Sequence, residues 1–239
     1  MEITPSSSTD DPPPDTTTTS TASSKHVYGV IQTPGSTCTG GVASMLPCLP
    51  GLNVQGVGNI PLPLNNTTAA TLKTVAKQQT PYGHGMQTVV DTTSIRNTLQ
   101  IHADQISFTN PAWKENLDKL TRQVAVALGA SNPVQARLYK MLLHETGGIF
   151  KTPTHKDDSE KEHGMFATLV VQLPSIFTGG ALVVKHNNKD AARTFPMDTP
   201  SIAPYSCQYV AHCADCDHEI LPVESGHRLT LTRALLLHG

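Results

Sequence analysis

The segment His155-Lys156-Asp157, followed by His218 and then by Arg228, contains the residue types that can bind a ferrous ion and a carboxylate. Two neutral imidazoles and one carboxylate suit Fe(II), and three protein ligands on one face of the ion leave three positions free for reactants. A structural metal site would instead be closed by protein ligands. The order of these residues therefore favours a catalytic metal site with an anion-binding arginine beside it.

The H-x-D pattern by itself is weak evidence in a chain with 11 histidines, and it occurs twice, at residues 102–104 and 155–157. Only the second pair lies among predicted strands, where a distant histidine can close on it. In an extended segment the side chains of His155 and Asp157 leave the same face, whereas Asp158 points away. The spacing therefore favours His155 and Asp157 as the pair that binds metal.

The segment 225–232 is predicted to form a turn and then a strand, in which Arg228, Thr230 and Thr232 share one face. A guanidinium group makes two parallel charge-assisted hydrogen bonds to a carboxylate, which fix the orientation of the bound group. We therefore expect Arg228, with a hydroxyl nearby, to bind the far carboxylate of a dicarboxylic acid. His218 is expected at the start of the preceding strand.

Two helices are predicted before the strand-rich half of the chain. Residues 66–78 carry apolar side chains at helical spacing behind Asn and Thr residues that can cap a helix. Residues 111–128 follow Asn110 as a cap, begin with a proline, carry an apolar stripe that includes Trp113, and end before Gly129. The stripe indicates core packing rather than cofactor binding.

From about residue 137 to residue 237 the pattern changes to short β-rich runs separated by Gly, Pro, Asn and Asp. These runs are 138–143, 166–173, 181–184, 205–211 and 228–237. They predict an antiparallel sandwich or barrel.

The first 50 residues offer little to a hydrophobic core. They begin with polar, low-complexity Ser, Thr and Pro runs and continue into a segment rich in Gly, Pro and small residues. We therefore predict a disordered N-terminal segment at residues 1–50 and one compact domain at residues 51–239.

Charge and hydropathy exclude several classes of partner. The formal net charge of -2 and the charged content of 15% give no basic field that would attract nucleic acid or an anionic membrane. No apolar run could span a bilayer and no signal peptide follows Met1, so we expect a soluble, intracellular protein of the cytoplasm or nucleus. The five cysteines are odd in number and irregularly spaced, which argues against a disulfide framework.

Seven short segments stand in a specific order along the chain: LYKMLL at 138–143, GGIFK at 147–151, HKD at 155–157, GMFATLVVQLP at 164–174, GGALVV at 179–184, DCDHE at 215–219 and SGHRL at 225–229. From about residue 54 to the C-terminus, this set resembles 2-oxoglutarate and Fe(II)-dependent oxygenases of the prolyl 4-hydroxylase-like group. The resemblance implies a mostly β fold with supporting α-helices and a double-stranded β-helix core, also called a jelly roll or cupin-like core. It also implies His155, Asp157 and His218 as iron ligands and Arg228 as the anchor of 2-oxoglutarate.

The same resemblance implies a dioxygenase that hydroxylates an unactivated C–H bond with O2 and decarboxylates 2-oxoglutarate to succinate and CO2. Ascorbate is a candidate reductant. The substrate stays open between a prolyl peptide or protein and a small amino-acid-like metabolite, because the loops carry no recognisable recognition code. The oligomeric state also stays open.

The chain departs from the resemblance at the end of the first core strand. The oxygenases commonly have a Tyr-Glu pair there, whose tyrosine reaches the cosubstrate, and this chain has His144-Glu145. His144 is therefore a candidate ligand of 2-oxoglutarate beside Arg228 and Thr230. Its hydrogen-bond donation would depend on pH, because imidazole titrates near neutral pH.

Two other hypotheses are compatible with the sequence. One is a zinc-binding structural module built on Cys213, Cys216 and His218, since thiolate and imidazole are preferred zinc ligands. A second cysteine pair at similar spacing, which a zinc ribbon needs, is missing from the sequence. The other hypothesis is a non-catalytic oxygenase-like protein that binds a partner.

Overall fold

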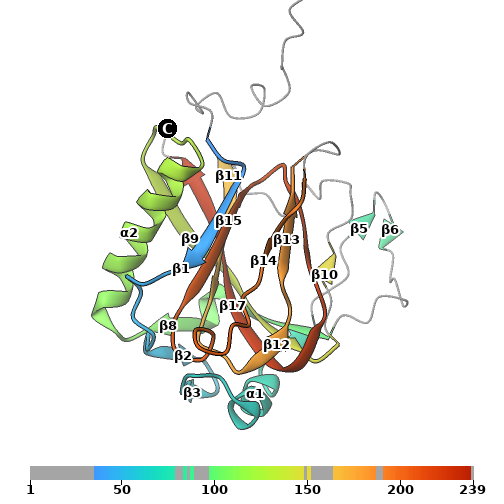
Figure 1. Ribbon diagram of the computed structural model, residues 1–239. Coiled ribbons are helices and arrows are strands. Elements are labelled where there is room, and N and C mark those ends of the chain that lie inside the picture. Colours follow the sequence, from blue (N-terminus) through green and yellow to red (C-terminus); the bar gives the residue numbers. More distant parts are fainter. Residues whose placement is uncertain are drawn as a thin grey trace, which may run out of the picture.

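The computed structural model describes residues 35–78, 83–84, 87–88, 97–147, 150–151, 164–186 and 191–237. Within these ranges two main antiparallel β-sheets face each other, and α2 lies on the outer side of one of them (Figure 1). The larger one, called the large sheet, has the order β1 (Cys38–Val42), β15 (Gln208–Cys213), β11 (Met165–Gln172), β17 (Val223–Leu237), β9 (Val134–Glu145), β7 (Thr98–His102) and β4 (Lys77–Gln78), and β12 (Phe177–Gly179) also pairs with β17. The other, called the small sheet, has the order β10 (Phe150–Lys151), β16 (Asp217–Ile220), β13 (Leu182–Lys185) and β14 (Arg193–Phe195).

From β9 onward the chain passes back and forth between the two sheets. Strands β9, β11, β15 and β17 belong to the large sheet, and β10, β13, β14 and β16 belong to the small sheet. This alternation is the topology of a double-stranded β-helix, so the predicted jelly-roll core is confirmed.

A three-stranded sheet of β3 (Gly58–Asn59), β2 (Leu52–Val54) and β8 (Ile106–Phe108) lies at the barrel end at which α1 (Asn66–Lys73) lies (Figure 1). Elsewhere, β5 (Gly83–His84) pairs with β6 (Gln87–Thr88). A single 3-10 turn, Ala103–Gln105, connects β7 to β8.

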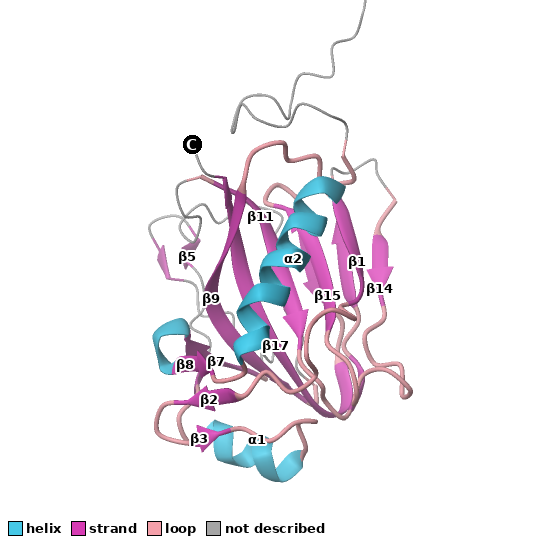
Figure 2. Cartoon of the chain, turned by 90° about the vertical axis from the view of Figure 1, so that its left-hand side faces the viewer, coloured by secondary structure: helices cyan, strands magenta, loops and turns pink. Residues whose placement is uncertain are grey.

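Helix α2 (Pro111–Ala127) confirms the prediction for residues 111–128 to within one residue. The Asn110 side chain accepts a hydrogen bond from the Ala112 amide at 3.0 Å, and Gly129 follows the helix with a φ of 80°. Figure 2 shows the helix lying across one face of the large sheet. Among the described residues, no helix has both the length and the hydropathy needed to cross a bilayer.

The helix predicted at residues 66–78 is shorter in the structure. Helix α1 ends at Lys73, and residues 77–78 form β4, which pairs with β7. At the C-terminus of the helix, the Thr74 hydroxyl donates to the Thr71 carbonyl at 2.8 Å. Thr74 still has a helical backbone, with φ of -67° and ψ of -25°, and the chain is extended only from Lys77, where pairing with β7 outweighs the apolar pattern that suggested a longer helix.

Ordered structure begins earlier than the predicted boundary at residue 51. Strand β1 pairs with β15 over its whole length, and Cys38, Ala43 and Leu46 are buried. The segment CTGGV has little intrinsic preference for a strand. A side chain at Gly40 would meet the Tyr209 carbonyl at 2.8 Å, so glycine permits the close approach to β15.

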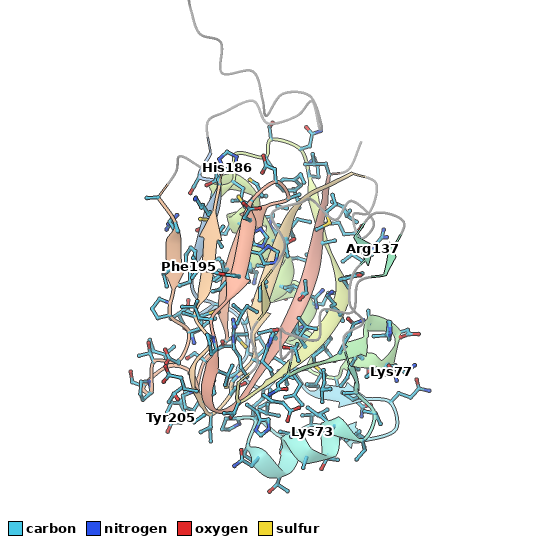
Figure 3. All side chains as sticks on the ribbon, turned by 90° about the vertical axis from the view of Figure 1, so that its right-hand side faces the viewer. Lys73, Lys77, Arg137, His186, Phe195 and Tyr205 are labelled. Atoms are coloured by element: carbon cyan, nitrogen blue, oxygen red, sulfur yellow. The ribbon has the colours of Figure 1, made fainter. Side chains whose placement is uncertain are left out.

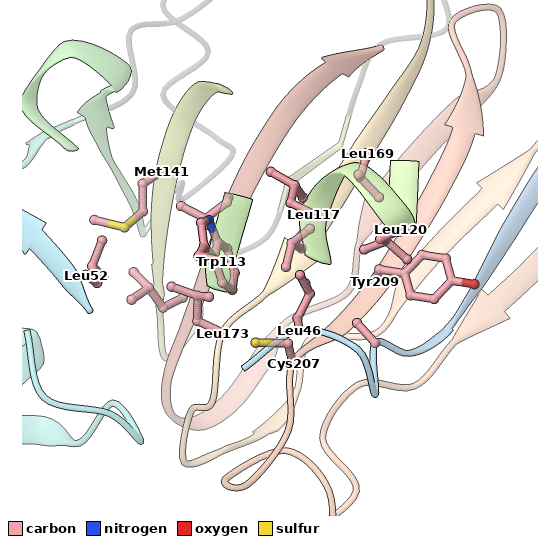
Figure 4. Packing of buried hydrophobic residues seen from close by; sticks show 14 of the residues in the cluster. Leu46, Leu52, Trp113, Leu117, Leu120, Met141, Leu169, Leu173, Cys207 and Tyr209 are labelled. Carbon is pink, nitrogen blue, oxygen red and sulfur yellow. The ribbon is translucent and has the colours of Figure 1, made fainter. Parts of the chain in front are cut away.

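The two faces of the large sheet differ in composition. The outer face carries Leu143, Leu169, Leu229 and Leu231, which pack with the Trp113 side of α2 in one apolar cluster (Figure 4). Successive strand residues point to opposite faces, so their sequence neighbours lie on the inner face towards the small sheet. The buried polar residues of the inner face include Thr98, Lys140, His144, Gln172, Gln208, His212, Arg228 and Thr230.

Candidate functional site

The structure describes four of the six predicted site residues: His144, His218, Arg228 and Thr230. His155 and Asp157 lie in 152–163, outside the described residues. The strand just before that segment, β10, pairs with β16, the strand that contains His218.

His218 lies on the inner face of the small sheet. It is paired with Val184 and lies two residues before Ile220, and both of these side chains pack between the two sheets. Its neighbour in the pairing, Asp217, is opposite Lys185, so this part of β16 lies towards His186. In Figure 3 His186 is at the end of the barrel opposite to Tyr205. His218 is the second residue of β16, so the prediction that it lies near the start of a strand is confirmed.

The His218 imidazole is held in its neutral form. Burial lowers its pKa to about 3, with smaller lowering contributions from His212 and Lys140, while the Cys216 carbonyl raises it. A neutral imidazole keeps a nitrogen lone pair, which is the form that binds a metal. The environment of His218 therefore suits a metal ligand.

His212, on β15, is an interior residue that sequence reasoning missed. Its ring centroid lies 4.5 Å from that of His218, with the ring planes tilted by 36°. The His212 Nδ1 donates to the Cys213 carbonyl at 3.0 Å, which leaves Nε2 as the unprotonated nitrogen. Among the described residues this buried Nε2 has no hydrogen-bond partner. The strand alternation that places Arg228 inside the barrel could also have placed His212 there.

Arg228 is fully buried, with 0% of its surface exposed. Its guanidinium donates from Nε to Gln172 Oε1 at 2.9 Å, from Nη1 to the Gly180 carbonyl at 2.9 Å and from Nη2 to Met197 Sδ at 3.0 Å. Burial lowers the pKa of Arg228 to about 10, and the Asp198 carboxylate partly offsets this effect. Arg228 therefore stays charged at neutral pH.

All three acceptors of Arg228 are uncharged. Within the described part of the chain, no carboxylate lies at ion-pair distance from this guanidinium. The Asp198 carboxylate acts on Arg228 only from a distance and accepts a hydrogen bond from the Gly179 amide at 2.8 Å. A buried charge that lacks a directly bonded counter-charge is costly, and proteins normally pair such a group or bind an ion of opposite sign. The surroundings of Arg228 therefore fit a site that an anionic ligand completes.

His144 and Thr230 lie next to Arg228, as the predicted strand faces require. Arg228 is paired with His144 across β17 and β9. The His144 Nε2 is 3.3 Å from Thr230 Oγ1, and its Nδ1 is 3.2 Å from Thr98 Oγ1. Burial and then the Arg228 charge lower the pKa of His144 well below 6.5. The imidazole is therefore neutral near pH 7 and forms hydrogen bonds with the hydroxyl groups of Thr98 and Thr230.

Cys213, Cys216 and His218 do not converge as the zinc hypothesis requires. No group of three or more His, Cys, Asp or Glu side chains in the described residues could hold a metal ion. The Cys216 amide donates to the Cys213 carbonyl at 3.1 Å, so the two cysteines flank a tight turn. Burial raises the pKa of the Cys213 thiol to about 12, whereas zinc binds thiolates. The described residues therefore offer a zinc module no complete donor set.

The other H-x-D pair lies at the surface. His102 ends β7 with its side chain exposed, and Asp104 is exposed in the 3-10 turn that follows. Their placement agrees with the interpretation that residues 102–104 are ordinary surface residues.

A comparison with solved structures found similar chains at low sequence identity. A prolyl hydroxylase from Trichoplax adhaerens, solved in complex with a peptide fragment of the hypoxia inducible factor oxygen degradation domain, is 12% identical with a TM-score of 0.45; the match covers 81% of this chain and 88% of that one. A 2OG-Fe(II) oxygenase family oxidoreductase from Burkholderia pseudomallei is 16% identical with a TM-score of 0.42, over 72% and 79% of the chains. A viral collagen prolyl hydroxylase from Paramecium Bursaria Chlorella virus-1, in complex with 2OG, is 13% identical with a TM-score of 0.40, over 86% and 98%.

No protein-family model and no curated protein matches the chain. The solved proteins are of the kind that the ordered sequence segments resemble.

Proposed function

We propose that this chain is a 2-oxoglutarate and Fe(II)-dependent dioxygenase that hydroxylates a C–H bond. The observation that carries the proposal is the buried Arg228 guanidinium, whose hydrogen-bond partners among the described residues are all neutral and which lies inside the same barrel as His218. Such a guanidinium attracts a carboxylate, and the neutral buried imidazole of His218 offers a metal ligand. Together they suit a cosubstrate that binds an arginine at one end and a metal at the other.

The residues present fit a ferrous ion in their donor chemistry. His218 would bind it together with His155 and Asp157, which gives two imidazoles and one carboxylate. The buried His212 Nε2, without a partner among the described residues, adds an acceptor beside His218 that a metal-bound water could satisfy. When bound, Fe(II) with 2-oxoglutarate and O2 supplies the oxidising power for the reaction, which releases succinate and CO2.

The chain itself binds, orients and shields. The Arg228 fork would bind the far carboxylate of 2-oxoglutarate, with the Thr230 hydroxyl beside it. His144 would hold that hydroxyl in place through the contact at 3.3 Å. Apolar side chains of both sheets, including Val170 and Val184, fill the space between the sheets and exclude water from the reacting groups.

The substrate class proposed is a prolyl peptide or protein, or a small amino-acid-like metabolite. These alternatives share an unactivated C–H bond next to an amide or amine.

Oxygen-dependent conversion of 2-oxoglutarate to succinate tests the proposal. The purified chain with Fe(II), ascorbate and a panel of prolyl peptides and amino acids should release succinate and yield a product heavier by one oxygen atom. Binding of 2-oxoglutarate without any conversion would instead support a non-catalytic binding protein. Zinc that survives purification, with no effect of 2-oxoglutarate, would support the structural module.

A further inference from the structure

Gln172 and Gln208 form a buried amide brace around Arg228. They are neighbours in the pairing of β11 with β15, and both are buried. The Gln172 Nε2 and the Gln208 Nε2 each donate to the Met197 carbonyl at 2.8 Å. Met197 also accepts from Arg228 through its sulfur. The brace therefore joins Arg228, on β17, to strands β11 and β15 and to the segment that contains Met197.

The orientation of the Gln172 amide follows from these partners. A backbone carbonyl can only accept, so the side of Gln172 that faces Met197 must be its NH2 group. Its oxygen then faces Arg228 and accepts from Nε at 2.9 Å. Gln172 thus restrains the guanidinium without neutralising it.

Arg228 has more N–H donors than the three hydrogen bonds observed among the described residues use. A guanidinium has five N–H donors, and the three observed bonds use the one on Nε and one on each terminal nitrogen. One N–H on Nη1 and one on Nη2 have no hydrogen-bond partner among the described residues. Two N–H groups on the terminal nitrogens are what a carboxylate uses in a bidentate pair.

We propose that Gln172 is a positioning residue that holds Arg228 charged and oriented for the carboxylate of an anionic cosubstrate. The inference rests on the proposed function for the identity of that anion, 2-oxoglutarate. A carboxylate at position 172 would satisfy the Arg228 charge internally and compete with the ligand. The neutral amide leaves the charge to be completed by the ligand.

Two isosteric variants test this role. Gln172→Glu places a carboxylate against the Arg228 Nε, where the adjacent cation keeps it ionised. Gln208→Glu is the matched control, since it is one strand further away, is equally buried, and bonds Met197 but not Arg228. Thermal unfolding of the metal-free, ligand-free chain and the affinity for 2-oxoglutarate with Fe(II) in the absence of oxygen are measured for both.

The inference predicts a separate result for each of the two measurements on Gln172→Glu. The melting temperature should be about 2–4 °C above that of Gln208→Glu, because both variants lose the donor to the Met197 carbonyl but only Gln172→Glu gives the buried guanidinium a bonded counter-charge, and the affinity for 2-oxoglutarate should fall at least about tenfold. Gln208→Glu should melt at a lower temperature than the wild type, because its carboxylate is buried without a cation beside it. A Gln172→Glu protein that melts no higher than Gln208→Glu, or that binds 2-oxoglutarate as tightly as the wild type, overturns the inference.

A second variant decides the matter if Gln172→Glu does not fold. Gln172→Met keeps the size of the side chain and removes the acceptor of Nε, so the KM for 2-oxoglutarate should rise about tenfold while kcat changes little. An unchanged KM overturns the inference. A wild-type chain that binds no 2-oxoglutarate overturns the proposed function. In that case the melting temperature of ligand-free Gln172→Glu, compared with that of Gln208→Glu, still decides whether Gln172 leaves the charge of Arg228 without a bonded counter-charge.

Discussion

The outer and inner faces of the large sheet are built from alternate residues of the same strands, but the outer face is apolar and the inner face carries buried polar residues. The outer face buries leucines under α2 in a continuous apolar cluster. The inner face buries Arg228, His144 and Gln172 at a cost in desolvation. Apolar burial explains why the sheet is stable, but it does not explain why polar residues are buried on the inner face. The anionic ligand proposed above would pair with the buried charge and so account for these residues.

Arg228 and Leu229 are adjacent in sequence and point to opposite faces, so they separate the two roles most sharply. Arg228→Met should lower kcat/KM for 2-oxoglutarate on the order of a hundredfold or more, because two charge-assisted hydrogen bonds to the cosubstrate are lost. The free energy of unfolding should change by less than about 2 kcal/mol, since removing a buried unpaired charge offsets the lost hydrogen bonds. Steady-state kinetics and urea unfolding check this result. Equal losses in both would erase the distinction between the faces.

Leu229→Ala should produce the reverse pattern. Leu229 is fully buried in the outer cluster, and truncation should lower the free energy of unfolding by about 2–5 kcal/mol. The KM for 2-oxoglutarate, measured at a temperature where the variant is folded, should stay close to the wild-type value. A large rise in KM would show that the two faces are not independent.

The inner face also predicts how stability depends on pH. Burial and Arg228 lower the pKa of His144 well below 6.5, so the unfolded chain binds this proton more readily than the folded chain. Stability is fully present above about pH 6.5 and is lost as the pH falls below it, by up to about 1.4 kcal/mol per pH unit for this one group. Urea unfolding between pH 7 and pH 5 should show a shallower loss for His144→Phe than for the wild type. The same slope in both proteins would mean that His144 is protonated in the folded state.

Thr230→Val should have the smallest effect. It removes the hydroxyl that contacts His144 at 3.3 Å while keeping the shape of the side chain, and a hydrogen bond of about 1 kcal/mol corresponds to a roughly fivefold higher KM for 2-oxoglutarate. Thr232→Val, on the same face one step along β17, is the control and should leave the KM unchanged. If both variants behave alike, Thr230 has no specific part in the site.

Local sequence signals were sufficient for much of the fold. Helix α2 follows from its cap, its proline and its apolar stripe, and the runs around β11, β13 and β17 follow from β-rich residues between turn residues. Strand β1 and the early end of α1 could not be read this way. Both depend on pairing with strands that are distant in sequence, which local preference does not contain.

The site residues, too, differ in whether local sequence could predict them. The shared face of Arg228 and Thr230 follows from strand alternation alone. Gln172 bonds Arg228 from 56 positions away, and His212 meets His218 only because their two strands face each other across the barrel. Lys140, buried near His218, was also missed. The pairing of β9 with β17 shifts register between Lys140 and Leu138, which alters the alternation just before Lys140.

The most direct test of the account is a titration of the metal-free chain with Fe(II) and then 2-oxoglutarate in the absence of oxygen, followed by visible absorption. The wild type should develop the charge-transfer band of a metal-bound 2-oxo acid, His218→Ala should develop none, and Arg228→Met should need far more 2-oxoglutarate to reach it. A wild-type chain without the band at saturating concentrations, or a band that persists unchanged in His218→Ala, would contradict the claim that the barrel interior joins a metal at His218 to an anion at Arg228.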